Sequence, residues 1–183
     1  MLKIRFVVLK FLFYACAAVV LAVLQNTPGL FVILGSKPML VAAFAVAVAM
    51  FEGELAGAFA GAFGGILCDL FSYYRSGYYA LIFFFCCMAV GLLVQGFMRP
   101  VVINCCLFTF LTMLLSQLVT FFFLFLIRGY DGPELFFLLQ ILPLCAYTAI
   151  TAFPAFYGVR WVHLWFRKKI IPEESHEGGP GTA

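Results

Sequence analysis

Charged side chains are rare inside the apolar stretches of this chain, and the chemistry that they could support there is the movement of protons or ions. The residues of this class within or at the edge of the apolar stretches are Lys10, Glu52, Glu54, Asp69 and Arg99. A proton or ion relay usually needs acids near the middle of the membrane. Asp69 follows Glu54 by fifteen residues, about 22 Å along a helix, so we expect Asp69 near the outer interface. The pattern does not favour transport chemistry.

Glycines recur at every fourth position ahead of Asp69, at Gly53, Gly57, Gly61 and Gly65. Residues four apart lie nearly above one another on a helix, so the row predicts a bare groove with a carboxylate at its end. Glycine inside a helix costs about 1 kcal/mol relative to alanine, and close packing can offset that cost. The row is therefore interpreted as a helix-packing or partner-binding surface.

Asp69 is interpreted as a structural acid at the interface. It could accept hydrogen bonds from the first free N–H groups of the next helix, near Ser76 and Gly77, or pair with Arg75. The alternative is that Asp69 belongs to a binding site for a partner or ligand.

Motifs of the common enzyme classes are not found. The sequence has no G-x-S-x-G, no H-E-x-x-H and no Walker lysine, and its two histidines, His163 and His176, are too few for a metal site. All seven cysteines lie in apolar stretches without a C-x-x-C pair, as small hydrophobic residues would. We expect no catalytic residue, no metal site, no cofactor and no enzymatic activity.

The elements that must position these residues are transmembrane helices. Only 10% of the 183 residues are charged and the mean hydropathy is +1.12, which excludes an ordinary soluble domain. A membrane core of about 30 Å needs about 20 apolar residues per helix. Such stretches cover residues 6–25, 55–71, 78–98, 101–127 and 135–158, with a shorter one at 39–51. The prediction is an all-α polytopic membrane protein of about six helices, with one integral domain over residues 1–171 and a disordered polar tail over 172–183.

The short stretch at 39–51 is either a short span packed inside the bundle or the first arm of a re-entrant hairpin, and we favour the span. Basic residues then divide eight to three across the membrane, out of eleven. Since cytoplasmic loops carry the excess of lysine and arginine, both termini should be cytoplasmic. The first apolar stretch lacks a convincing cleavage site and is expected to remain as a span. No nucleic-acid binding is expected.

A longer motif contains the glycine row: the spacing G-x-x-x-G-x-x-x-G-I-L-x-D-L from Gly57 to Leu70, followed by G-x-x-A-L from Gly77. In this motif, and more generally from Gln25 to about Gln95, the chain resembles the MreD family of bacterial rod shape-determining membrane proteins. The chain departs from the family at Met39, where the family often has an acid, and at Ser76, where it often has proline. From Pro100 onward the similarity is in hydropathy alone.

The resemblance implies a non-enzymatic scaffold in the membrane of the cell-elongation machinery. Its direct partner would be MreC, acting with RodA and a penicillin-binding transpeptidase in lateral peptidoglycan synthesis and cell shape. It also implies a fold similar to the substrate-binding components of energy-coupling-factor transporters. We expect the small-residue surface of residues 53–69 to build a close-packed core and to leave a groove for a partner's transmembrane helix, such as that of MreC.

Two other functions are considered. The main alternative is a vitamin-binding component of an energy-coupling-factor transporter, which predicts polar groups that converge near the outer face. A flippase for lipid-linked precursors would need a charged central cavity, which the sequence does not predict. Neighbouring genes for MreB and MreC, or for a pair of ATPases, would separate the first two functions.

Overall fold

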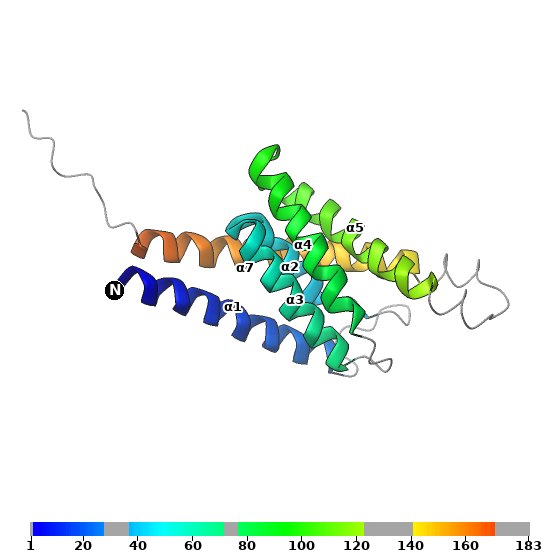
Figure 1. Ribbon diagram of the computed structural model, residues 1–183. Coiled ribbons are helices and arrows are strands. Elements are labelled where there is room, and N and C mark those ends of the chain that lie inside the picture. Colours follow the sequence, from blue (N-terminus) through cyan, green and yellow to red (C-terminus); the bar gives the residue numbers. More distant parts are fainter. Residues whose placement is uncertain (1, 28–36, 72–76, 123–140, 171–183) are drawn as a thin grey trace, which may run out of the picture.

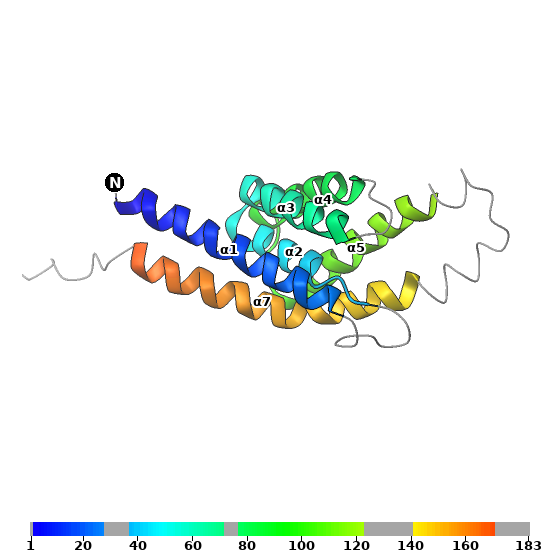
Figure 2. The ribbon, with the colours of Figure 1, turned by 90° about the horizontal axis from the view of Figure 1, so that it is seen from below.

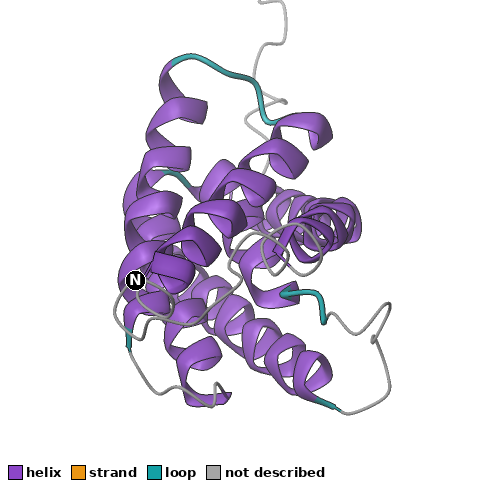
Figure 3. Ribbon diagram, turned by 90° about the vertical axis from the view of Figure 1, so that its right-hand side faces the viewer, coloured by secondary structure: helices purple, strands orange, loops and turns teal. Residues whose placement is uncertain are grey.

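The computed structural model describes residues 2–27, 37–71, 77–122 and 141–170, and within these ranges the regular structure is helical (Figures 1 and 3). The helices are α1 (Leu2–Asn26), α2 (Leu40–Glu52), α3 (Glu54–Phe71), α4 (Tyr78–Gly96), α5 (Val102–Phe121) and α7 (Leu142–Ile170). All but α2 are long and apolar enough to cross a membrane. The predicted all-α polytopic fold of about six helices is confirmed over the described residues.

Helices α1 and α7 run alongside each other, and the start of α1 and the end of α7 project from the bundle at the same end (Figures 1 and 2). Helix α1 has 25 residues and α7 has 29, or about 37 and 44 Å at 1.5 Å per residue. Both are longer than a membrane core of about 30 Å. Their projecting ends therefore extend beyond the apolar part of the bundle.

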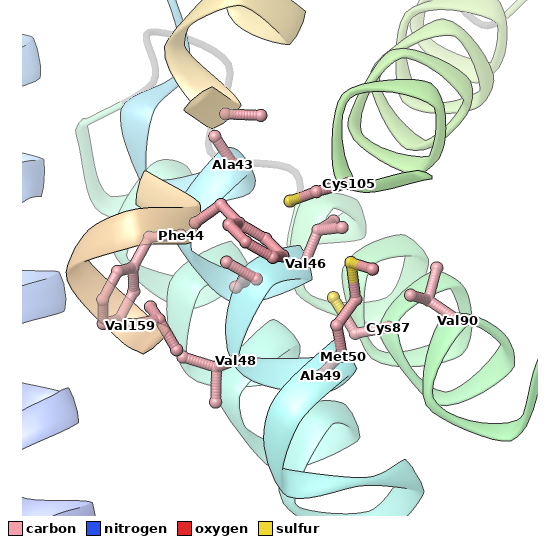
Figure 4. Packing of buried hydrophobic residues seen from close by; sticks show 14 of the residues in the cluster. Ala43, Phe44, Val46, Val48, Ala49, Met50, Cys87, Val90, Cys105 and Val159 are labelled. Atoms are coloured by element: carbon pink, nitrogen blue, oxygen red, sulfur yellow. The ribbon is translucent and has the colours of Figure 1, made fainter. Parts of the chain in front are cut away.

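The short helix α2 forms the centre of the fold. Ten of its 13 residues, from Val41 to Met50, are buried, and α1, α3, α4, α5 and α7 all pack on it. Its sequence of alanine and valine is apolar on every face, which suits a helix without lipid contact. In Figure 4, Val159 of α7, Cys105 of α5 and Cys87 of α4 approach α2 from different sides. Small side chains on α2 allow this many neighbours to come close.

Helix α2 crosses the bundle rather than folding back within it. Near its start, the Val41 N–H donates to Gln25 Oε1 at the end of α1, and at its other end Glu52 contacts Lys10 near the beginning of α1. The fifteen residues of α1 between these levels correspond to about 22 Å. Glu52 thus lies at the end of the bundle from which α1 and α7 project, which favours a short span over a re-entrant hairpin.

The last helix differs from the predicted span at 135–158. Helix α7 begins at Leu142 within the described residues and continues to Ile170. Pro143 lies in its first turn, where a missing N–H costs no helical hydrogen bond, and Pro154 is accommodated inside it. The predicted end at residue 158 is therefore wrong. The predicted tail at 172–183 and the position of Arg75 lie outside the described residues.

Candidate functional site

The glycines of α3 face the chain's own neighbouring helices. A Cβ atom added at Gly65 would lie 2.6 Å from the backbone nitrogen of Ala80 on α4, and one added at Gly61 would lie 2.9 Å from Cys87 Sγ and closer still to the Phe83 carbonyl. At Gly57 the added atom would meet Ala49 Cβ of α2 at 2.5 Å and the Cys87 carbonyl at 3.3 Å. Real Cβ atoms essentially never approach this closely. Helices α3 and α4 accordingly form the most extensive helix pair in the described bundle.

Two further glycines complete this packing, and sequence analysis assigned neither of them. Gly91 of α4 lies against the backbone of Glu54, where an added Cβ would come within 2.6 Å of the Glu54 Cα. Gly64 faces α2, where an added Cβ would lie 2.9 Å from Val41 Cγ1. Gly91 was missed because it is not part of a four-residue repeat like that of Gly57, Gly61 and Gly65.

Gly53 has a different role from the rest of the row. It lies between α2 and α3 with φ +94° and ψ −173°, a conformation that is essentially restricted to glycine. The side-chain amide of Gln95 occupies the space that a Cβ atom at this position would take. Gly53 therefore makes the turn that lets α2 and α3 pack antiparallel.

This arrangement changes the expected position of a partner groove. In the structure α4 occupies the face formed by Gly57, Gly61 and Gly65. A partner helix has no access to those three residues while α4 is in place. The neighbouring face of α3, which carries Ala56 and Ala60, is only partly buried.

Asp69 is partly buried near the end of α3 and contacts the beginning of α4. Its Oδ2 atom accepts a hydrogen bond from the Ala80 N–H at 3.1 Å, in the first turn of α4. Gly77 is the residue before that helix and has φ +70°. The other carboxylate oxygen, Oδ1, is buried and has no hydrogen-bond partner among the described residues. Asp69 thus satisfies one of the free donors of a helix N-terminus.

The main polar cluster of the described bundle joins three helices at the end where α1 and α7 project. Glu52 of α2 lies 2.6 Å from Lys10 Nζ of α1, and its Oε1 atom accepts a hydrogen bond from the Tyr14 hydroxyl at 2.9 Å. His163 Nδ1 of α7 is also 2.9 Å from this oxygen. A carboxylate oxygen can only accept, so this contact places a proton on Nδ1.

The four side chains satisfy one another. The side chains of Lys10 and Glu52 are 11% and 10% exposed, and Glu52 has a donor from each of three neighbouring side chains. Burying a charge is costly unless it is paired and hydrogen-bonded, and here both conditions are met. The hydrogen bonds and the ion pair of this cluster therefore suit a structural role, in which they hold α1, α2 and α7 in position relative to one another.

The sequence shows Lys10, Glu52 and His163 only as separate residues and does not predict that they meet. A signal was present, since alternating spans put all three at the same end of the bundle. What the sequence lacked was the rotation of each helix about its axis, which decides the residues that face each other.

Cavities of the described bundle lie between helices and are mostly apolar. Two of about 620 and 430 Å³ adjoin each other between α1 and α7. A shallower one of about 150 Å³ lies between α1 and α3, beside Ala56 and Ala60. Another of about 460 Å³ lies at the α3–α4 end beside Asp69, with Ile66, Leu70, Gly77 and Ala80 around it.

Metal ligands do not gather in the part of the chain that the structure describes, where no group of three or more His, Cys, Asp or Glu side chains could hold an ion. Among the described residues, the cysteines form no disulfide.

Comparison with known proteins gives no relative: no family model, no curated protein and no solved structure matches this chain. Its likeness to the MreD family and to energy-coupling-factor components stays a prediction from the residues quoted above.

Proposed function

We propose that this protein is a non-enzymatic membrane scaffold of the bacterial cell-elongation complex. It binds MreC and, with RodA and a penicillin-binding transpeptidase, helps to direct lateral peptidoglycan synthesis and so cell shape. The basis is the motif from Gly57 to Leu81, which resembles the MreD family, together with a multi-pass helical bundle of matching length. The internally satisfied Lys10–Glu52–His163 cluster fits a structural role better than a catalytic one.

The observation that supports helix docking most directly is the groove between α1 and α3. Its floor contains Ala15 of α1 with Ala56 and Ala60 of α3, and Phe59 and Phe63 stand beside it with 70% and 37% exposure. Small residues let the backbone of another helix approach, and in lipid such close packing drives helix association. This groove takes the place of the one predicted at Gly61 and Gly65.

Co-purification with MreC tests the proposal. Ala60→Leu fills the floor of the groove and is expected to lower the amount of MreC recovered about tenfold, the effect of losing about 1.4 kcal/mol of binding free energy. Ala89→Leu is the matched control, since Ala89 is exposed on α4, away from this groove. Equal recovery of MreC with both variants, at equal insertion and thermal stability, would reject the docking surface.

The scaffold proposal itself is tested on the unaltered protein. The expected result is stable recovery of MreC and no tight binding of a vitamin by the purified protein. Tight binding of a vitamin without recovery of MreC would reject the scaffold proposal and favour the vitamin-binding component of a transporter. The cavity beside Asp69 is then where such a ligand would be sought.

We further propose the bacterial cytoplasmic membrane as the location, with the N- and C-termini in the cytoplasm. The basis is the distribution of basic residues, which favours the side carrying Arg5, Arg160 and the run from Arg167 to Lys169. A reporter enzyme that works only in the cytoplasm should be active when fused to either terminus, and one that works only in the periplasm should be inactive. Activity of a periplasmic reporter at either end would contradict this orientation.

A further inference from the structure

Helices α1 and α7 leave an open groove between them. The two adjoining cavities between them share Phe13, Cys16, Trp161 and Val162 as lining residues. The small residues Ala17 of α1 and Ala155 and Gly158 of α7 leave the space open. All these residues fall within the apolar windows Val8–Asn26 and Leu142–Phe166.

The groove is large enough for a narrow apolar occupant. Its two parts measure about 620 and 430 Å³, within the range of small-molecule sites. An acyl chain is narrow enough to lie along its length.

One end of the groove lies near a basic side chain. Arg5 is exposed and precedes Leu9 by one turn on the same face of α1. Trp161 and Trp165 are 68% and 46% exposed, as expected for aromatic residues at a membrane interface. The nearby acid Glu52 is already paired with Lys10 and does not offset this charge.

We propose that α1 and α7 form a binding site for an anionic phospholipid. One acyl chain lies in the groove between Cys16 and Gly158, and the phosphate of the headgroup lies at the Arg5 end. Basic pockets between helices on the cytoplasmic side are a known way to hold anionic headgroups. This inference goes beyond the scaffold function and does not depend on it.

Native mass spectrometry of the full-length protein in mild detergent tests the headgroup preference. Phosphatidylglycerol is expected to be retained at about one fifth of the concentration that phosphatidylcholine with the same chains requires, because each basic residue near the surface attracts anionic lipid. Arg5→Gln should reduce this preference for phosphatidylglycerol. It should not affect the contribution of the acyl chain to binding. Equal retention of the two lipids by the unaltered protein would overturn the proposal.

Filling the groove tests the position of the chain. A Cβ atom added at Gly158 meets nothing within 4 Å and Gly158 lines the cavity, so the side chain in Gly158→Leu is expected to occupy the groove. Both lipids should then be lost, while Ala89→Leu on the exposed face of α4 retains them. Cys16→Phe fills the groove from the α1 side and repeats the test if Gly158→Leu does not accumulate.

Two outcomes would reject the site. Unchanged lipid retention by a stable groove-filling variant would show that the lipid binds elsewhere. Loss of MreC recovery from such a variant, with lipid retention intact, would make the groove a helix-docking surface instead.

Discussion

Glu52 and Lys10, 42 residues apart in the chain, form a buried ion pair in which Lys10 Nζ lies 2.6 Å from the carboxylate. The pair connects the end of the short central helix α2 to the long peripheral helix α1. His163 of α7 contacts the same carboxylate, so α7 is connected to α2 at this point as well. The position of α2 between its neighbours is thus held at one end by charge and along its length by apolar packing.

Removing one partner of this pair should destabilise the protein strongly. Glu52→Leu leaves the Lys10 ammonium buried without its counterion, and breaking such a pair costs about 3–5 kcal/mol. The expected result is a clear fall in melting temperature of the detergent-solubilised protein. Glu54→Gln, two residues further along, is the control and should change stability little, since Glu54 forms no salt bridge within the described residues and is only partly buried.

The double variant Lys10→Met with Glu52→Leu gives a second test of the same pair. Replacing a buried ion pair by apolar residues of similar size is often neutral or stabilising, so most of the loss should be recovered. If the double variant loses as much stability as the two single variants together, the two charges do not act as a pair.

Gly65→Ala should destabilise the contact between α3 and α4. The added methyl group would lie 2.6 Å from the Ala80 nitrogen and the Tyr79 carbonyl, which are backbone atoms and cannot rotate away. Forcing extra volume into packed structure costs about 1–3 kcal/mol. Thermal unfolding measures the effect. In the control, Gly158→Ala, the methyl group meets open space and should raise helix stability by up to about 1 kcal/mol.

Gly53→Ala should weaken the α2–α3 turn. With φ +94° and ψ −173° the residue occupies a region that costs about 1–3 kcal/mol for other amino acids, and its methyl group would also displace Gln95. Gly96→Ala, at a glycine without close neighbours and at the end of α4, serves as control. A melting temperature that falls equally in both variants would contradict the special role of Gly53.

Asp69→Ala should loosen the first turn of α4. The Ala80 N–H would lose its acceptor, and loss of such a cap costs about 1 kcal/mol. Asp69→Asn keeps an acceptor oxygen and should stay within about 0.5 kcal/mol of the unaltered protein. Amide hydrogen exchange at Ala80 reports this directly: it should speed up in the alanine variant and remain slow in the asparagine variant.

Fold class and helix positions could be predicted because each depends on local composition. Runs of about 20 apolar residues require a helix in lipid, where every backbone polar group must be satisfied within its own segment. The end of α7 was misjudged because Trp161, His163 and Arg160 lower the hydropathy without interrupting the helix. Likewise, the four-residue spacing of Gly57, Gly61 and Gly65 indicated a closely approached helix face.

The identity of the approaching helix could not be predicted. Gly61 and Gly65 contact the backbone of Phe83, Tyr79 and Ala80, and backbone atoms are common to all residues. Such a surface leaves no pattern in the partner's sequence. The sequence therefore left open whether the row packs within the chain or against a partner, and in the structure α4 of the same chain covers Gly61 and Gly65.

By itself, the sequence determined that this is a bundle of membrane-type helices, with small residues where helices meet and few charges inside. Those properties follow from residue type and spacing along one helix. Only the tertiary structure decided that Lys10, Tyr14, Glu52 and His163 meet, that α4 covers the glycines and that a groove separates α1 from α7. These contacts depend on the rotation and tilt of whole helices, which the packing of many side chains determines together.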